Sequence, residues 1–167
     1  MKKSILLTFV FTATIGAALL TGCGKDSAPV YKSDNYVGTY YGYFTLESLA
    51  FSNAALDTVI GKQLPDTLTI SENGNTSDNI VTATSKVLST TIDLTLTSET
   101  AADLAITNKS INIQTVSATG VTANGTTSYN TSTKFLTLHA TATAGTVFGL
   151  PVLGVAKPVL GGYFTKQ

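Results

Sequence analysis

The fold class is decided by residues 91–97, which read Thr-Ile-Asp-Leu-Thr-Leu-Thr. Apolar and polar side chains alternate there without a break, so Ile92, Leu94 and Leu96 share one face and the threonines share the other with Asp93. A period of two is that of a β-strand, and a strand with one apolar face can keep its other face in water. The stretch therefore predicts an antiparallel strand with those three side chains in the core.

Similar short segments fill most of the chain. It contains thirty threonines and only 12% charged residues, and β-branched threonine favours strands over helices. Turns are predicted where asparagine is followed by glycine or another turn residue, at Asn73-Gly74, Asn108-Lys109, Asn124-Gly125 and Asn130-Thr131. Further strands are predicted at 36–45, 67–71, 80–85, 103–106, 111–116, 119–123, 126–129, 134–143 and 163–165. We therefore expect an all-β protein, a small antiparallel β-barrel built as a meander, with a β-sandwich as the alternative.

The first of these strands is rich in aromatic residues and contains two glycines. Alternation places Tyr36, Tyr40 and Phe44 on one face and Tyr41 and Tyr43 on the other. Glycine inside a strand permits a sharp bend or the close approach of another backbone, so we predict a strongly bent strand. The five aromatics are candidate ligand-binding residues, as a stacking platform for a sugar ring or an apolar ligand. Alternatively, they are core residues on one side and cross-strand pairs on the other.

Two apolar segments interrupt the alternation. Residues 46–64 follow neither a strand period nor a full helical period, and we predict a long connection with one or two helical turns. Residues 149–162 contain Pro-Val-Leu-Gly twice, and the prolines predict an edge strand or an apolar loop. Because exposed apolar side chains make a sticky patch, this segment must be covered. Leu153 and Leu160 are candidates to line a ligand pocket, or to pack as ordinary core.

The amino-terminal segment indicates export. Two lysines precede an apolar run that is too short for a typical membrane span and ends at Leu20-Thr21-Gly22-Cys23. This tetrapeptide resembles the lipobox of bacterial lipoproteins. The resemblance implies a signal peptide at 1–22, acylation of Cys23 and attachment to a membrane of the cell envelope, the outer membrane in our interpretation. Residues 23–34 then form a flexible tether, and 35–167 a single β domain.

Several functional classes find no support in the composition. Cys23 is the only cysteine and His139 the only histidine, so no cysteine-based metal motif exists and neither a metal nor a cofactor is expected. The net charge is +0 and arginine is absent, which disfavours nucleic acid as a partner. His139 is expected on the surface, because Leu136, Leu138 and Ala140 alternate with it. No catalytic constellation is found, so a non-enzymatic role is favoured.

The layout of the domain resembles the calycin superfamily, and in particular the calycin-like, lipocalin-like lipoproteins of Bacteroidetes. Gly38-Thr39-Tyr40 stands where lipocalins carry Gly-x-Trp, and residues 46–64 stand where their long loop lies. The chain departs from the pattern in having no tryptophan, and no arginine on the last strand to pack over it. The resemblance implies that an apolar or amphipathic small molecule is bound. The alternative is a structural or adhesive envelope module that binds glycan or protein.

Three tripeptides also resemble the Asp-(Ser/Thr)-apolar acceptor pattern for O-glycosylation in Bacteroidetes. They would place the sugar on Ser27, Thr58 or Thr67.

Overall fold

The alternating segments close into a barrel in the computed structural model, which describes residues 29–47, 59–75, 78–114, 116–151 and 158–167. Within these ranges the only helix is the three-residue 3₁₀ helix η1, and no helix is long and apolar enough to cross a membrane. The elements are η1 (Ser33–Asn35), β1 (Gly38–Glu47), β2 (Gln63–Glu72), β3 (Ile80–Ser85), β4 (Thr90–Leu96), β5 (Ala101–Ile113), β6 (Val116–Asn130), β7 (Phe135–Val147), β8 (Leu150–Pro151) and β9 (Val159–Lys166).

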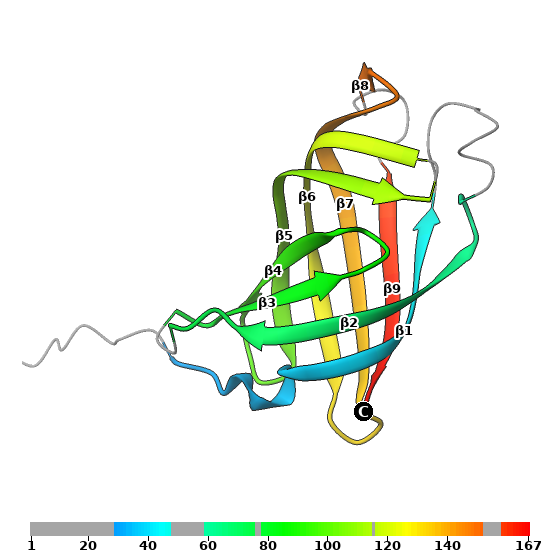
Figure 1. Ribbon diagram of the computed structural model, residues 1–167. Coiled ribbons are helices and arrows are strands. Elements are labelled where there is room, and N and C mark those ends of the chain that lie inside the picture. Colours follow the sequence, from blue (N-terminus) through cyan, green and yellow to red (C-terminus); the bar gives the residue numbers. More distant parts are fainter. Residues whose placement is uncertain (1–28, 48–58, 76–77, 115, 152–157) are drawn as a thin grey trace, which may run out of the picture.

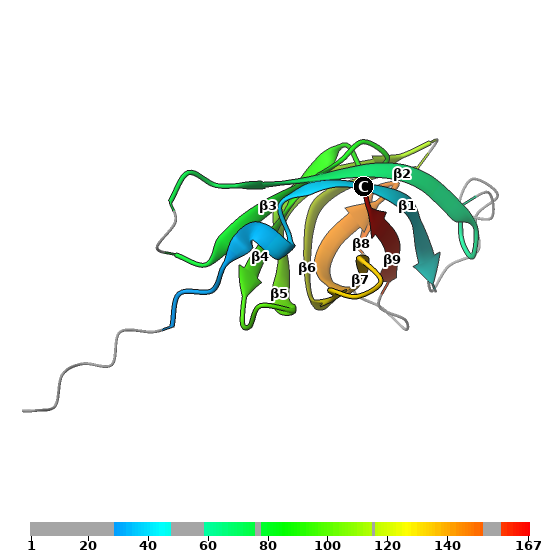
Figure 2. The same ribbon diagram turned by 90° about the horizontal axis from the view of Figure 1, so that it is seen from below.

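The strands follow one another around the barrel as a meander. Each of β1 to β7 pairs antiparallel with the next, and β9 pairs with both β7 and β1, which closes the circle (Figures 1 and 2). Among the described residues, eight strands thus form the wall, and the two-residue β8 adds only to β7. Because β9 pairs with β1, neither the first nor the last strand is left as a free edge. The predicted all-β barrel is confirmed, and its β-sandwich alternative is wrong.

The period-two pattern sets which side chains enter the core. Ile92, Leu94 and Leu96 are all buried, whereas Asp93 and Thr95 are exposed, as the sequence predicts. On β7, Leu136, Leu138 and Ala140 are buried and His139 is exposed, so the surface position of the histidine is confirmed. The outward positions are mostly polar, which suits a wall that faces water.

Two predicted turns lie inside strands instead. Asn108-Lys109 lies in β5, where the register with β6 shifts and Asn108 takes the left-handed φ of +49°. Asn124-Gly125 lies in β6, where both residues pair with β5 and with β7. Asparagine and glycine are needed there for a bulge and for close strand packing, because a Cβ on Gly125 would overlap the backbone of His139.

As a result, β5 and β6 are longer than the sequence predicts. The predicted strand 111–116 is wrong, because β5 ends at Ile113 and β6 begins at Val116. The chain reverses between them after Gln114, which has φ +51°. Figure 1 shows both strands bending near the bulges, so that the tip of the β5–β6 hairpin crosses over one end of the barrel.

The last strand also differs from the prediction. Val159 to Gly162 belong to β9, which is paired on both sides and is neither an edge strand nor a loop. Pro158 stands just before the strand, so its missing N–H removes no bond from the ladder. β8 is the edge strand, and 152–157 lie outside the described residues.

The first strand, β1, bends along its length (Figure 1), as its glycines predict. A Cβ on Gly42 would overlap the Tyr163 carbonyl oxygen and lie 2.7 Å from the Cα of Phe164. Only glycine allows β9 to lie this close to β1.

Residues preceding β1 contact the barrel, although 29–34 fall within the predicted tether. The Asn79 side chain accepts a hydrogen bond from Tyr31 N (2.8 Å) and donates one to the Pro29 carbonyl (2.9 Å).

Candidate functional site

An apolar cavity occupies the end of the barrel that the β5–β6 hairpin crosses. Its interior offers about 80 Å³ to the centre of a water-sized sphere, several times the space that one water molecule needs. Fourteen residues line it, and all of their side chains are apolar: Leu46, Leu88, Ile106, Ile111, Ile113, Val116, Ala118, Val121, Ala123, Ala140, Ala142, Val147, Pro158 and Leu160. Since this lining offers no side-chain hydrogen bond, it suits hydrocarbon rather than a polar group.

The cavity exists because the inward side chains of β6 and β7 become smaller towards this end of the barrel. Towards the cavity, the inward residues of β7 change from Leu136 and Leu138 to Ala140 and Ala142. The neighbouring strand matches this change, because Ala123 of β6 pairs with Ala142. Alanine removes volume that leucine would fill, and a well-packed core would leave no such gap. The alanines on facing positions therefore hollow out this end.

Two segments that connect strands, the β5–β6 hairpin and the β3–β4 turn, contribute side chains to the cavity lining. The β5–β6 hairpin contributes Ile111, Ile113, Val116 and Ala118, and the turn between β3 and β4 contributes Leu88, which is fully buried. A backbone hydrogen bond from Asn112 N–H to the Leu88 carbonyl (3.3 Å) joins the two segments.

The turn that carries Leu88 is held by a buried carboxylate. Asp66 accepts hydrogen bonds from the Ser85 hydroxyl (2.5 Å) and from the backbone N–H groups of Lys86 and Val87 (3.2 Å each). Ser85 Oγ in turn accepts from Leu88 N–H (2.9 Å). A buried carboxylate is tolerated only when it is hydrogen bonded in this way, so the role of Asp66 is to fix the turn.

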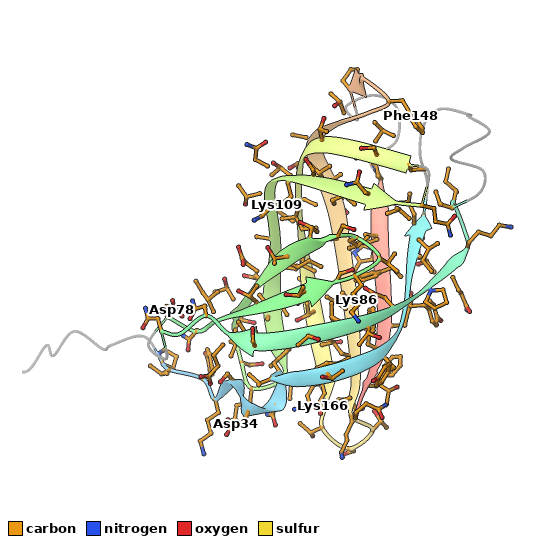
Figure 3. The ribbon with its side chains drawn as sticks, viewed as in Figure 1. Asp34, Asp78, Lys86, Lys109, Phe148 and Lys166 are labelled. Carbon is orange, nitrogen blue, oxygen red and sulfur yellow. The ribbon has the colours of Figure 1, made fainter. Side chains whose placement is uncertain are left out.

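The opposite end of the barrel is closed by aromatic rings and a lysine. The Tyr129 ring lies 5.8 Å from that of Tyr36 and 6.4 Å from that of Tyr40. The Lys166 ammonium lies 6.0 Å from the centre of the Tyr40 ring and 5.9 Å from that of Tyr129, a cation–π geometry. It also donates to the Asp34 and Asn35 carbonyls at 2.9 and 3.0 Å. Figure 3 shows Lys166 and Asp34 at this end and Phe148 at the other.

Burial shifts the ionisation of this cluster. It raises the pKa of Tyr36 to about 12, against a smaller lowering by the neighbouring Thr127 hydroxyl. Burial also raises the pKa of Tyr40 well above its usual range and lowers that of Lys166, which Asp34 partly offsets. At neutral pH, the tyrosines are therefore uncharged and close the barrel as apolar rings.

The structure separates the candidate ligand residues of the sequence. Tyr36, Tyr40 and Phe44 are buried away from the cavity lining, Phe44 in an edge-to-face pair with Phe164 at 4.9 Å. Tyr41 and Tyr43 point outward on β1, Tyr41 being 52% exposed. Of the six candidates that lie in the described residues, only Leu160 lines the cavity.

The other candidates lie elsewhere. Leu153, Cys23, Ser27 and Thr58 lie outside the described residues. Thr67 is half-buried in β2. The sequence did not single out the alanines that make the cavity. Their signal was present, since alanine replaces leucine at alternate positions along residues 136–142.

Within the described ranges, no group of three or more His, Cys, Asp or Glu side chains could hold a metal ion. Comparison of the chain with protein-family models, curated proteins and solved structures found no match.

Proposed function

We propose that the protein is an exported, lipid-anchored β-barrel that binds an apolar or amphipathic small molecule in its cavity. The observation that carries the proposal is the lining, in which every one of the fourteen side chains is apolar. A cavity of this kind gains free energy by taking up hydrocarbon from water, at roughly 25 cal/mol per Å² of apolar surface buried. The adhesive or structural alternative needs no such cavity.

The closed end supports the resemblance to calycins. The family pattern pairs a tryptophan on the first strand with an arginine on the last. This chain has Tyr40 and Lys166 at these places, and the lysine ammonium lies 6.0 Å from the tyrosine ring centre. The phenol ring of Tyr40 and the ammonium of Lys166 thus make a cation–π contact comparable to that of tryptophan with arginine.

Ligand binding is tested by titrating the purified domain with a fluorescent apolar probe. The substitution Ala142→Phe places a ring in the cavity and should weaken probe binding at least tenfold. Ala105→Phe is the matched control, because the same change is made on the outward face of β5, where Ala105 is half-buried outside the cavity lining. Probe binding that is equal in both variants and the parent would overturn the proposal. Native mass spectrometry of protein from its own host should identify the ligand.

The anchor is tested separately. We propose that Cys23 is acylated and that the protein resides in the cell envelope as an outer-membrane lipoprotein, on the basis of the lipobox resemblance. Two or more acyl chains hold a protein far better than one, at about 0.8 kcal/mol per buried CH₂. Cys23→Ser should leave an unprocessed precursor. A normally processed chain in the detergent phase after that change would refute acylation.

A further inference from the structure

A groove crosses the outer wall of the barrel, on the opposite side of the sheet from the cavity. Its walls include Tyr41 of β1 and Pro65 and Thr67 of β2, and Lys86 and Val87 of the β3–β4 turn close one side. Tyr41 points outward, while its neighbours Tyr40 and Phe44 point into the core. The groove and the cavity are therefore separate places on the molecule. Figure 3 shows Lys86 beside β2.

The groove presents an aromatic ring in a fixed position. Tyr41 is 52% exposed, and its backbone pairs with Thr67 on one side and Thr165 on the other. A tyrosine side chain has only two rotatable bonds before its hydroxyl, so little conformational entropy is lost when a ligand covers it. The face of its ring carries negative partial charge and attracts the C–H bonds of a sugar ring.

The groove also presents one free positive charge. Its carboxylate, Asp66, already accepts hydrogen bonds from Ser85 Oγ and from three backbone N–H groups, of Thr67, Lys86 and Val87. The ammonium of Lys86, by contrast, makes no hydrogen bond or ion pair with the described part of the chain. The charge that the groove leaves for a ligand is therefore positive.

The floor of the groove is formed by Gly42 and Asp66, which pair with each other across β1 and β2. On its other side, β2 pairs with β3 only at Leu68–Glu72. The side chains around this floor supply a ring face, a hydroxyl and an ammonium.

We propose that this groove binds an acidic sugar ring, as found in a glycan that contains uronic acid. The Tyr41 ring covers the apolar face of the sugar, and the Lys86 ammonium pairs with its carboxylate. Thr67, which pairs with Tyr41 and also lines the groove, supplies a hydroxyl for a hydrogen bond to a ring hydroxyl. This site goes beyond the cavity and does not depend on it.

The test is an NMR titration with a tetramer of galacturonic acid, compared with its methyl ester, which keeps the rings but removes the charge. Tyr41→Ala and Lys86→Gln should each weaken binding of the acid about tenfold, and Lys86→Gln should also abolish its dependence on salt. Urea midpoints establish that both variants are folded. Phe135→Ala and Lys134→Gln are the matched controls, because both residues are exposed outside the groove, and neither should change binding.

Three results would overturn the proposal. One is the absence of shifts at the groove amides with the acidic tetramer. Another is a loss in Phe135→Ala as large as that in Tyr41→Ala. Equal binding of the methyl ester would refute the assignment of an acidic sugar and indicate a neutral one.

Discussion

Replacing Ala140 with leucine distinguishes an empty cavity from a filled core. Ala140 is 2% exposed and lines the cavity, so the three added carbons have room. Burying each carbon is worth about 0.8 kcal/mol, and the side-chain entropy of the leucine removes about 0.5–1 kcal/mol of that gain. We expect the free energy of unfolding to rise by about 1–2 kcal/mol, measured by urea denaturation at an unchanged m-value. Binding of the apolar probe should weaken in the same variant.

The matched control is Ala83→Leu. Ala83 is fully buried between Ile70 and Ile92 on the neighbouring strands and is not part of the cavity lining. The same three carbons have no room there, and overpacking should cost about 1–3 kcal/mol. If Ala140→Leu lowers the stability as much as Ala83→Leu does, the space at Ala140 is not open and the reasoning fails.

Three other predictions concern the barrel. Leu94→Ala should cost about 2–5 kcal/mol and Thr95→Ala under about 1 kcal/mol in urea unfolding; equal costs would contradict the observed facing of β4. Gly42→Ala should cost about 3 kcal/mol or more, because its methyl group would overlap the Tyr163 carbonyl, and a normal urea midpoint would show that β1 and β9 can separate freely. Above pH 10, Tyr36 loses its proton more readily in the unfolded chain than in the folded protein, where its pKa is about 12, so the free energy of unfolding should fall with rising pH. Tyr36→Phe should make this fall less steep, and an unchanged dependence on pH would refute the raised pKa of Tyr36.

The fold could be predicted because one physical pattern is repeated along the whole chain. A strand with one buried face must alternate, and β3 has the predicted bounds Ile80–Ser85. The errors arose where one residue type serves two purposes. Asn124-Gly125 is a good turn dipeptide. Here, however, its glycine lies within β6 and allows the backbone of β7 to pack closely against it. Only the pairing of β6 with both neighbours distinguishes the two uses.

The cavity could not be located in the same way, because it depends on register. An alanine leaves a gap only where the facing residue is also small. Ala140 faces Gly125, and Ala142 faces Ala123, but these pairs are known only once β6 and β7 are aligned. The register runs without a shift from Asn130–Phe135 to Ala123–Ala142, but a turn at Asn124-Gly125, as the sequence predicts, would have removed both pairs.

The distribution of large side chains explains how the barrel can keep a hollow end. Tyr36, Tyr40, Phe44 and Phe164 are all fully buried, outside the cavity lining. Fully burying an aromatic or aliphatic side chain is worth about 1.5–3 kcal/mol, so this packed part supplies much of the stability that the alanine-lined end lacks. The cation–π contact of Lys166 with Tyr40 ties the last strand to the first at this end. With the barrel closed there, the opposite end is free to hold a ligand in place of core side chains.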